Sequence, residues 1–189
     1  MEPTQKDFPI FEANQVLTSE HLNTIFTYLD EQERLTRAHL IGIGIVCGLQ
    51  VKLGGTNADP IIHISKGCGV TSQGFQINVP DDLQLTHYRA DYTIENQYET
   101  GSALDPFEQF QVPGSDPAVQ VDLWELFEAG EEDNALPLGD TPGLLNNKAV
   151  LLFLELKQQG LRNCSPNNCD DKGSQVRATV KCLLIDTTH

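Results

Sequence analysis

The sequence predicts a mainly β protein with one long amphipathic helix, arranged as a β-sandwich or distorted barrel with an acidic, loop-rich insertion. Three observations predict this fold: one stretch of helical periodicity near the start, short β-branched segments separated by turn residues, and a middle region without basic residues. A chain of 189 residues has room for one domain. We therefore expect residues 1–17 to form an extended docking arm and residues 18–189 to form a single β-rich domain.

The helix is expected over residues 18–40, TSEHLNTIFTYLDEQERLTRAHL, which contain neither Gly nor Pro. Thr18 or Ser19 is placed to cap its first turn. At about 100° per residue, one side of this helix collects large apolar side chains. The interaction site predicted on this side consists of Leu22, Ile25, Phe26 and Leu29. Two roles stay open for this side of the helix: binding a partner subunit, or covering the sheet of its own domain.

The segment after the helix, IGIGIVCGLQVKL, predicts a buried strand because it is rich in β-branched residues. Gly42, Gly44 and Gly48 are structural glycines that allow bends or a close backbone approach. At Gly44 and Gly48 we expect a β-carbon to collide with the helix or a neighbouring strand. Further strands are expected at 61–65, 75–79, 85–95, 148–157 and 175–186.

The acidic insertion is expected over about residues 90–147, which contain 13 Asp and Glu but no Lys, Arg or His. These acids account for most of the net charge of −15. Within the insertion, residues 119–129 (VQVDLWELFEA) predict a short helix with Asp116 as its cap. So negative a chain repels a phosphate backbone, which argues against nucleic acid as a partner.

The apolar stretches, the first residues and the number of cysteines indicate the cellular compartment of the protein. No apolar stretch approaches the ~20 residues that cross a bilayer, so membrane insertion is not expected. The first residues, MEPTQKDF, lack the features of a signal peptide, and five cysteines is an odd number. Both observations favour synthesis in a reducing cytoplasm with free thiols.

The cysteines fall into two groups. Cys47, Cys68 and Cys182 lie within predicted strands and are expected to be small, buried and inert. Cys164 and Cys169 lie in a polar loop and are expected to be the reactive thiols. Their spacing fits no common zinc motif, so we predict no metal and no cofactor. A zinc site at this loop remains an alternative, with ligands from Cys164, Cys169, Asp170 and another chain or His189.

No constellation of residues indicates catalysis, so the protein is not expected to be an enzyme. The chain lacks the GxSxG nucleophile elbow, and His63 and His87 alternate within strands, as structural histidines do. Glu125 and Glu128 have the spacing of a solvated helix face rather than of a catalytic carboxylate pair. Two other functions remain alternatives: a β-sandwich module that binds carbohydrate or protein with the help of calcium, and a small hydrolase.

The run QVLTSEHLNTIFTYLDEQERLTRAHLIGIGIVCGLQV, followed by IIHISKGCGVTSQGFQI, resembles a pattern in proteins of extracellular contractile injection systems, the phage-tail-like particles of bacteria. That pattern runs from "LLT" through an acidic helix into a "GWGVVCGLEV" strand and a glycine-rich turn. The matching residues here are Leu17, Thr18, Gln32, Arg34, Arg37, Gly42, Gly44, Val46, Cys47, Gly48, Leu49, Val51, Gly67, Gly69 and Gly74. The chain departs from it at Ile43, where the family has an aromatic residue, at Ile41, where it has a histidine, and at Ser72, near an expected acid.

The same order of elements is similar in outline to the amino-terminal shell domain of the type VI secretion baseplate protein TssK and to the shoulder domain of phage receptor-binding proteins. The resemblance covers residues 8–80 and extends to the last two strands, but not to the acidic insertion. It implies a structural subunit, in or near the baseplate, that binds itself and other particle subunits. It also implies synthesis in the cytoplasm and assembly into a particle that is either released or membrane-anchored.

Overall fold

The computed structural model describes residues 8–90, 92, 121–162 and 171–187. The chain forms two compact units. The first unit contains residues up to 47 together with residues 68–76, and the second contains residues 48–67 and the chain from residue 77 onward. The arm and the helix thus share the first unit with the strand after the helix, and most of the β structure lies in the second unit.

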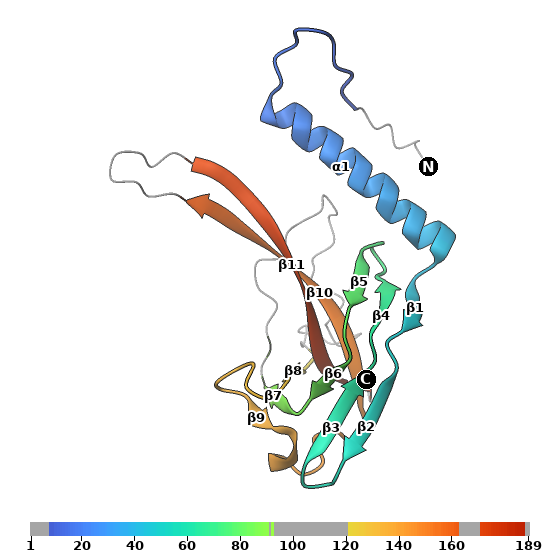
Figure 1. Cartoon of the computed structure of the whole chain (residues 1–189), viewed down its shortest axis with the longest axis vertical. Coiled ribbons are helices and arrows are strands. Elements are labelled where there is room, and N and C mark those ends of the chain that lie inside the picture. Colours follow the sequence, from blue (N-terminus) through green and yellow to red (C-terminus); the bar gives the residue numbers. More distant parts are fainter. Residues whose placement is uncertain (1–7, 91, 93–120, 163–170, 188–189) are drawn as a thin grey trace, which may run out of the picture. The chain divides into compact units, whose positions relative to one another are not determined.

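The predicted helix is confirmed as α1 (Ser19–Thr36), which continues as the π-helical turn η1 (Arg37–Ile41) (Figure 1). Thr18 caps it, because its Oγ1 accepts a hydrogen bond of 3.3 Å from the backbone N–H of His21. The helix ends at Gly42, whose φ of +102° favours glycine. Before the helix, the arm lies against it, with the Phe8 ring 4.9 Å from the Tyr28 ring.

The predicted strand after the helix divides into β1 (Gly44–Gly48) and β2 (Val51–Gly55). Each antiparallel partner lies further along the chain, in β4 (Gly67–Val70) and β3 (Pro60–Ile64) respectively. The prediction that this segment is buried is wrong, because every residue of β1 and nearly every residue of β2 is exposed. The strand order of one three-stranded sheet is β1-β4-β5, with β5 at Gln76–Val79.

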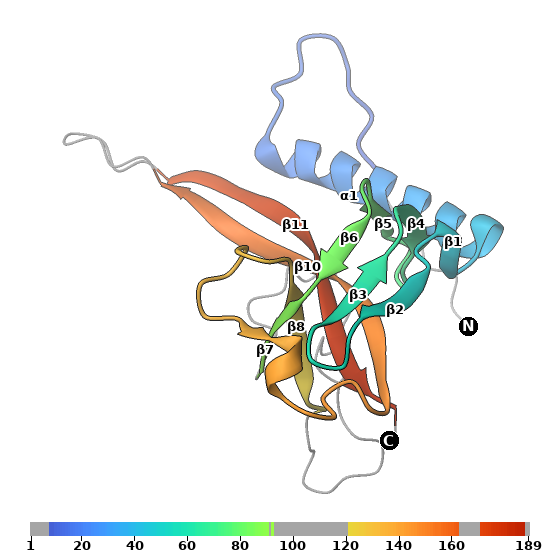
Figure 2. The same cartoon turned by 60° about the horizontal axis from the view of Figure 1, so that its bottom comes forward.

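Two sheets make up most of the second unit (Figure 2). One has the order β2-β3-β6, with β6 at Leu83–Leu85. The other has the order β10-β11-β8-β7-β9, built from β7 (His87–Arg89), β8 (Leu123–Phe127), β9 (Leu136–Pro137), β10 (Lys148–Arg162) and β11 (Asp171–Asp186). A 3-10 turn, η3 (Leu138–Asp140), follows β9. The molecule is therefore mainly β, as expected, and its described strands form several sheets without a closed barrel.

The helix predicted at residues 119–129 is wrong, because this segment contains strand β8. β8 pairs with β11 on one side and with β7 on the other. The local pattern suits a helix, but the strand has buried side chains on both faces of the sheet. Leu123 is buried on one face and Leu126 on the other. Part of the region predicted as a surface insertion thus lies inside the five-stranded sheet, while residues 93–120 of that region lie outside the described residues.

The main core belongs to the second unit and joins its two sheets. Side chains from β3, β6, β7, β8, β11 and η3 form one cluster: Ile62, Ile64, Leu85, Tyr88, Leu126, Leu138, Cys182 and Leu184. The hairpin β10–β11 extends beyond this core (Figure 1), pairing from Lys148 with Asp186 out to Arg162 with Asp171. No helix in the described part of the chain is long and apolar enough to cross a bilayer.

Candidate interaction surface

The apolar side of α1 is exposed. Of the predicted interaction residues, Leu22, Phe26 and Leu29 are 54%, 67% and 57% exposed, and Ile25 is partly buried. No residue of α1 is buried. We call Leu22, Phe26 and Leu29 the α1 face.

A second exposed apolar stretch directly follows the helix. It runs through η1 and β1 and consists of Leu40, Ile41, Ile43, Ile45 and Val46, each more than half exposed. β1 is also an edge strand of its sheet. An exposed, hydrophobic edge strand is a template on which another chain can pair.

The first unit has almost no core of its own. The three described hydrophobic clusters consist of residues of the second unit. In the described part of the first unit, Val70 is the buried hydrophobic residue. Within the first unit, the helix therefore has no described hydrophobic cluster to pack against.

Polar contacts hold the helix within the first unit instead. Arg37 Nε donates a hydrogen bond of 2.8 Å to the carbonyl oxygen of Gly74, and Arg34 Nη1 donates one of 3.3 Å to that of Gln73. The Arg34 guanidinium also lies 4.8 Å from the centre of the Phe75 ring. A β-carbon at Gly74 would lie 2.2 Å from the Arg34 carbonyl oxygen, so only glycine permits this approach. We call these contacts the arginine anchor.

The three structural glycines have different roles. Gly42 and Gly44 have φ values of +102° and +121°, and a β-carbon at either would meet no atom within 4 Å. The collision expected at Gly44 is therefore wrong, and its backbone conformation is what favours glycine there. At Gly48 the collision is real, because a β-carbon would lie 2.0 Å from the Lys66 carbonyl oxygen.

The expectation for the cysteines is correct for one of the three described thiols. Cys182 is buried, which raises the pKa of its thiol to about 12. Cys47, by contrast, is exposed on β1, whose residues are all exposed, and Cys68 is partly exposed at the less buried start of β4. Cys164 and Cys169 lie outside the described residues.

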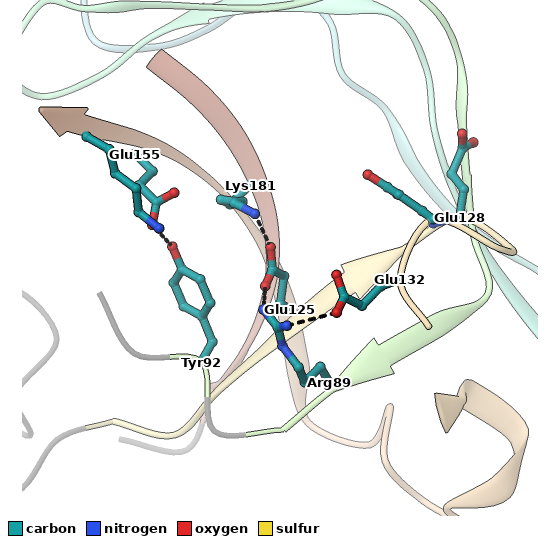
Figure 3. Close-up of polar contacts among 9 residues, drawn as sticks. Arg89, Tyr92, Glu125, Glu128, Glu132, Glu155 and Lys181 are labelled. Atoms are coloured by element: carbon teal, nitrogen blue, oxygen red, sulfur yellow. Dashed lines mark hydrogen bonds and ion pairs between the residues drawn. The ribbon is translucent and has the colours of Figure 1, made fainter. Parts of the chain in front are cut away.

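A buried group of charges lies on one side of the five-stranded sheet (Figure 3). Glu125 on β8 is 1% exposed and accepts hydrogen bonds from Arg89 on β7, at 2.6 Å, and from Lys181 on β11. Arg89 also pairs with Glu132 at 3.3 Å. The solvated helix face predicted for Glu125 is therefore wrong, since both of its carboxylate oxygens are engaged inside the sheet.

A second buried carboxylate lies on the same side of this sheet. Glu155 on β10 is 3% exposed and accepts a hydrogen bond of 2.8 Å from the Tyr92 hydroxyl. Burial, followed by this hydrogen bond to a carboxylate, raises the pKa of Tyr92 well above its ordinary value. Lys157 pairs with Glu155 at 3.3 Å.

Together these charges have the character of a structural network. A general base or nucleophile needs an oxygen that faces a substrate, whereas the oxygens of Glu125 each bind a cation of a neighbouring strand. Of the predicted structural histidines, His87 shares a hydrogen bond of 2.8 Å with Thr86. Among the described residues, no group of three or more His, Cys, Asp or Glu side chains is arranged to hold a metal.

Sequence reasoning found the α1 face but missed the network. Periodicity identifies an apolar helix face directly, whereas the network needs the strand register that places Arg89 opposite Glu125. The local signal was Glu125, a single acid within the otherwise apolar run Leu123–Phe127. No protein-family model matches this chain, and no curated protein sequence shows significant similarity to it.

Proposed function

We propose that the protein is a non-enzymatic structural subunit of a contractile, phage-tail-like injection particle, in or near the baseplate or its attachment points. The observation that carries this proposal is the 18-residue helix α1, which buries no residue and exposes Leu22, Phe26 and Leu29. The resemblance of residues 8–80 to particle subunits indicates which kind of assembly the protein would join. The partners are other subunits of the particle and further copies of this chain.

The energetics favour a protein on the α1 face. Helices in proteins owe most of their stability to packing of an apolar face rather than to intrinsic helix propensity. Each large apolar side chain contributes about 1.5–3 kcal/mol when it is fully covered. A neighbouring subunit that covers the α1 face would therefore stabilise the helix and the assembly together.

The charge of the helix distinguishes a protein partner from a membrane surface. α1 carries Glu20, Asp30, Glu31 and Glu33, and Arg34 is its single Lys or Arg. Helices that lie on membranes are rich in Lys and Arg, because membrane surfaces are anionic. An apolar surface on another protein fits the α1 face better.

The second unit would serve as a rigid framework in the particle. In this proposal its two sheets, which share one core, form a β-sandwich like that of shell and shoulder domains. The buried ion pairs of Glu125 join three neighbouring strands and would help hold this geometry. The subunit is made in the cytoplasm and acts mechanically after assembly.

The test is incorporation into particles. An epitope-tagged chain is expressed in the bacterium that encodes it, and particles are separated from free protein on a density gradient. We expect the wild type to co-sediment with sheath and tube proteins and Phe26→Asp to stay in the free fraction while retaining its circular dichroism spectrum. Thr27→Asp is the matched control, because Thr27 is exposed on the same helix and lies outside the α1 face.

Two results would contradict this proposal in different ways. If sheath and tube proteins sediment together and the wild-type chain never joins them, the proposed function is wrong. If wild type and Phe26→Asp join them equally, the subunit assembles by a surface other than the α1 face.

A further inference from the structure

Two cysteines of the first unit lie next to each other on paired strands. The Sγ atoms of Cys47 on β1 and Cys68 on β4 are 3.4 Å apart. They are 21 residues apart in the sequence, so their proximity comes from strand pairing.

The register of the hairpin explains this proximity. β2 and β3 pair antiparallel from Gly55 with Pro60 to Val51 with Ile64. Backbone hydrogen bonds continue the register, from Ser65 to Gln50 at 3.0 Å and from Leu49 to Lys66 at 3.4 Å. The same register carried two residues further places Cys47 opposite Cys68, so backbone pairing brings the two thiols together.

Solvent can reach this pair. Cys47 is exposed and Cys68 is partly exposed, whereas Cys182 is buried. Thiol–disulfide exchange requires access to the attacking sulfur. Of the described cysteines, Cys47 and Cys68 combine access with a second thiol in contact.

We propose that Cys47 and Cys68 form a reversible redox site, a dithiol in a reducing compartment and a cross-strand disulfide after reaction with a small-molecule disulfide. The Cys47 thiolate attacks one sulfur of the small disulfide, whose S–S bond breaks and releases one thiolate. Cys68 then attacks Cys47 Sγ and displaces the second thiolate. Two protein thiols are oxidised to one disulfide, one small disulfide is reduced to two thiols, and the two protons end on the released thiols.

The order of attack follows from the surroundings. Cys47 is the more exposed sulfur. The hydrogen bond with Cys47, followed by desolvation, raises the pKa of Cys68, so less of Cys68 is thiolate at neutral pH. Cys47 is therefore the attacking thiol and Cys68 the resolving thiol.

Oxidation would also act on the helix. β1 directly follows η1, and β4 directly precedes the turn whose carbonyl oxygens bind Arg34 and Arg37. A Cys47–Cys68 bond would therefore join the two chain segments that also meet at the arginine anchor. This inference rests on the strand geometry and is independent of the proposed function.

The experiment is a redox titration of the full chain with Cys164→Ser and Cys169→Ser, so that these two thiols do not compete. The folded protein is equilibrated in glutathione buffers of graded ratio, quenched by acid, and digested without reduction. We expect one linked Cys47–Cys68 peptide that disappears on addition of dithiothreitol, with Cys182 unmodified. The equilibrium constant for closure should exceed that of the urea-unfolded chain by at least about tenfold, equivalent to about 30 mV for a two-electron couple.

Three variants complete the test. Cys47→Ser and Cys68→Ser should each carry one glutathione on the thiol of the pair that remains. Cys182→Ala should form the Cys47–Cys68 disulfide as the wild type does. The proposal is overturned if the folded protein carries glutathione on Cys47 and Cys68 separately. It is equally overturned if both thiols stay free, or if closure is no more favourable than in the unfolded chain.

Discussion

Gly48 combines two constraints at a single residue. Its φ is +62°, and a β-carbon there would lie 2.0 Å from the Lys66 carbonyl oxygen. Overpacking typically costs about 1–3 kcal/mol, and a left-handed backbone costs a further ~1–2 kcal/mol for a residue with a β-carbon. We expect Gly48→Val to lower the free energy of unfolding by about 2–5 kcal/mol, measured by urea denaturation with the fluorescence of Trp124.

Gly160 provides the control for this substitution. It lies in β10, has no positive φ, and a β-carbon there would meet no atom within 4 Å. Gly160→Val should therefore leave the urea midpoint unchanged or raise it, since valine suits a strand. Equal midpoints for Gly48→Val and Gly160→Val would show that the backbone at Gly48 relaxes freely.

Cys182 makes stability depend on pH in the alkaline range. Its thiol has an ordinary pKa of 9.0 in the unfolded chain and one of about 12 in the folded protein. The folded state therefore keeps a proton that the unfolded state loses, so the stability from this group is present below pH 9.0 and is lost as the pH rises toward about 12.

A comparison of variants isolates this effect. Between these two pKa values, the wild type should lose up to about 1.4 kcal/mol per pH unit more than Cys182→Ala, measured from urea midpoints at each pH. Tyr92→Phe should, like Cys182→Ala, lose less unfolding free energy per pH unit than the wild type, because burial also raises the pKa of Tyr92. Identical slopes for wild type and Cys182→Ala would show that the thiol ionises equally in both states.

At the scale of the element, α1 depends on the arginine anchor. The contact from Arg37 to Gly74 is a partly buried, charged hydrogen bond of 2.8 Å. Such a bond contributes about 1.5–3 kcal/mol. We expect Arg37→Met to speed amide hydrogen exchange at least about tenfold in the last turns of α1 and in residues 71–75. Exchange in β10 and β11 should not change.

The matched control is Glu33→Gln. It removes the ion pair between Glu33 and Arg37 but keeps the contact of Arg37 with Gly74. Exposed pairs of this kind contribute little, so Glu33→Gln should exchange like the wild type. If Arg37→Met behaves the same way, the helix is held by something other than this anchor.

Elements with strong local signals were predictable from the sequence. α1 has a cap at Thr18, helical periodicity and no glycine, β10 begins with a long apolar run, and β11 alternates apolar with polar residues over Val176–Cys182. β8 was not predictable, because VQVDLWELFEA fits either period and pairing with β7 and β11 decided its state. A segment's environment is set by the rest of the fold and can override local preference.

The candidate site was predictable only in part, for a related reason. The predicted interaction site at Leu22, Ile25, Phe26 and Leu29 follows from spacing alone, and the structure exposes three of its four residues. The exposure of β1 was not predictable, because an apolar β-branched run is normally covered. The contact of Cys47 with Cys68 required the hairpin register, which no local pattern reveals.

At the scale of the whole molecule, the buried apolar side chains are distributed unequally between the two units. The described hydrophobic clusters belong to the second unit. The first unit holds α1 and η1, with exposed side chains and polar anchors. Regions with few buried apolar contacts open at lower free energy than packed cores.

We therefore predict that the two units of the isolated chain unfold separately. Two optical probes report on them: far-UV circular dichroism follows the helix of the first unit, and fluorescence follows Trp124, the single tryptophan, in the second unit. In a urea titration, the helical signal should be lost at a lower midpoint than the one at which the tryptophan signal changes. A single cooperative transition would instead give the same midpoint for both probes. A partner that covers the α1 face should raise the first midpoint and leave the second unchanged, since only the first unit gains buried surface. Coincident midpoints in the isolated monomer would mean that the first unit draws its stability from the core of the second, and that α1 needs no partner to stay folded.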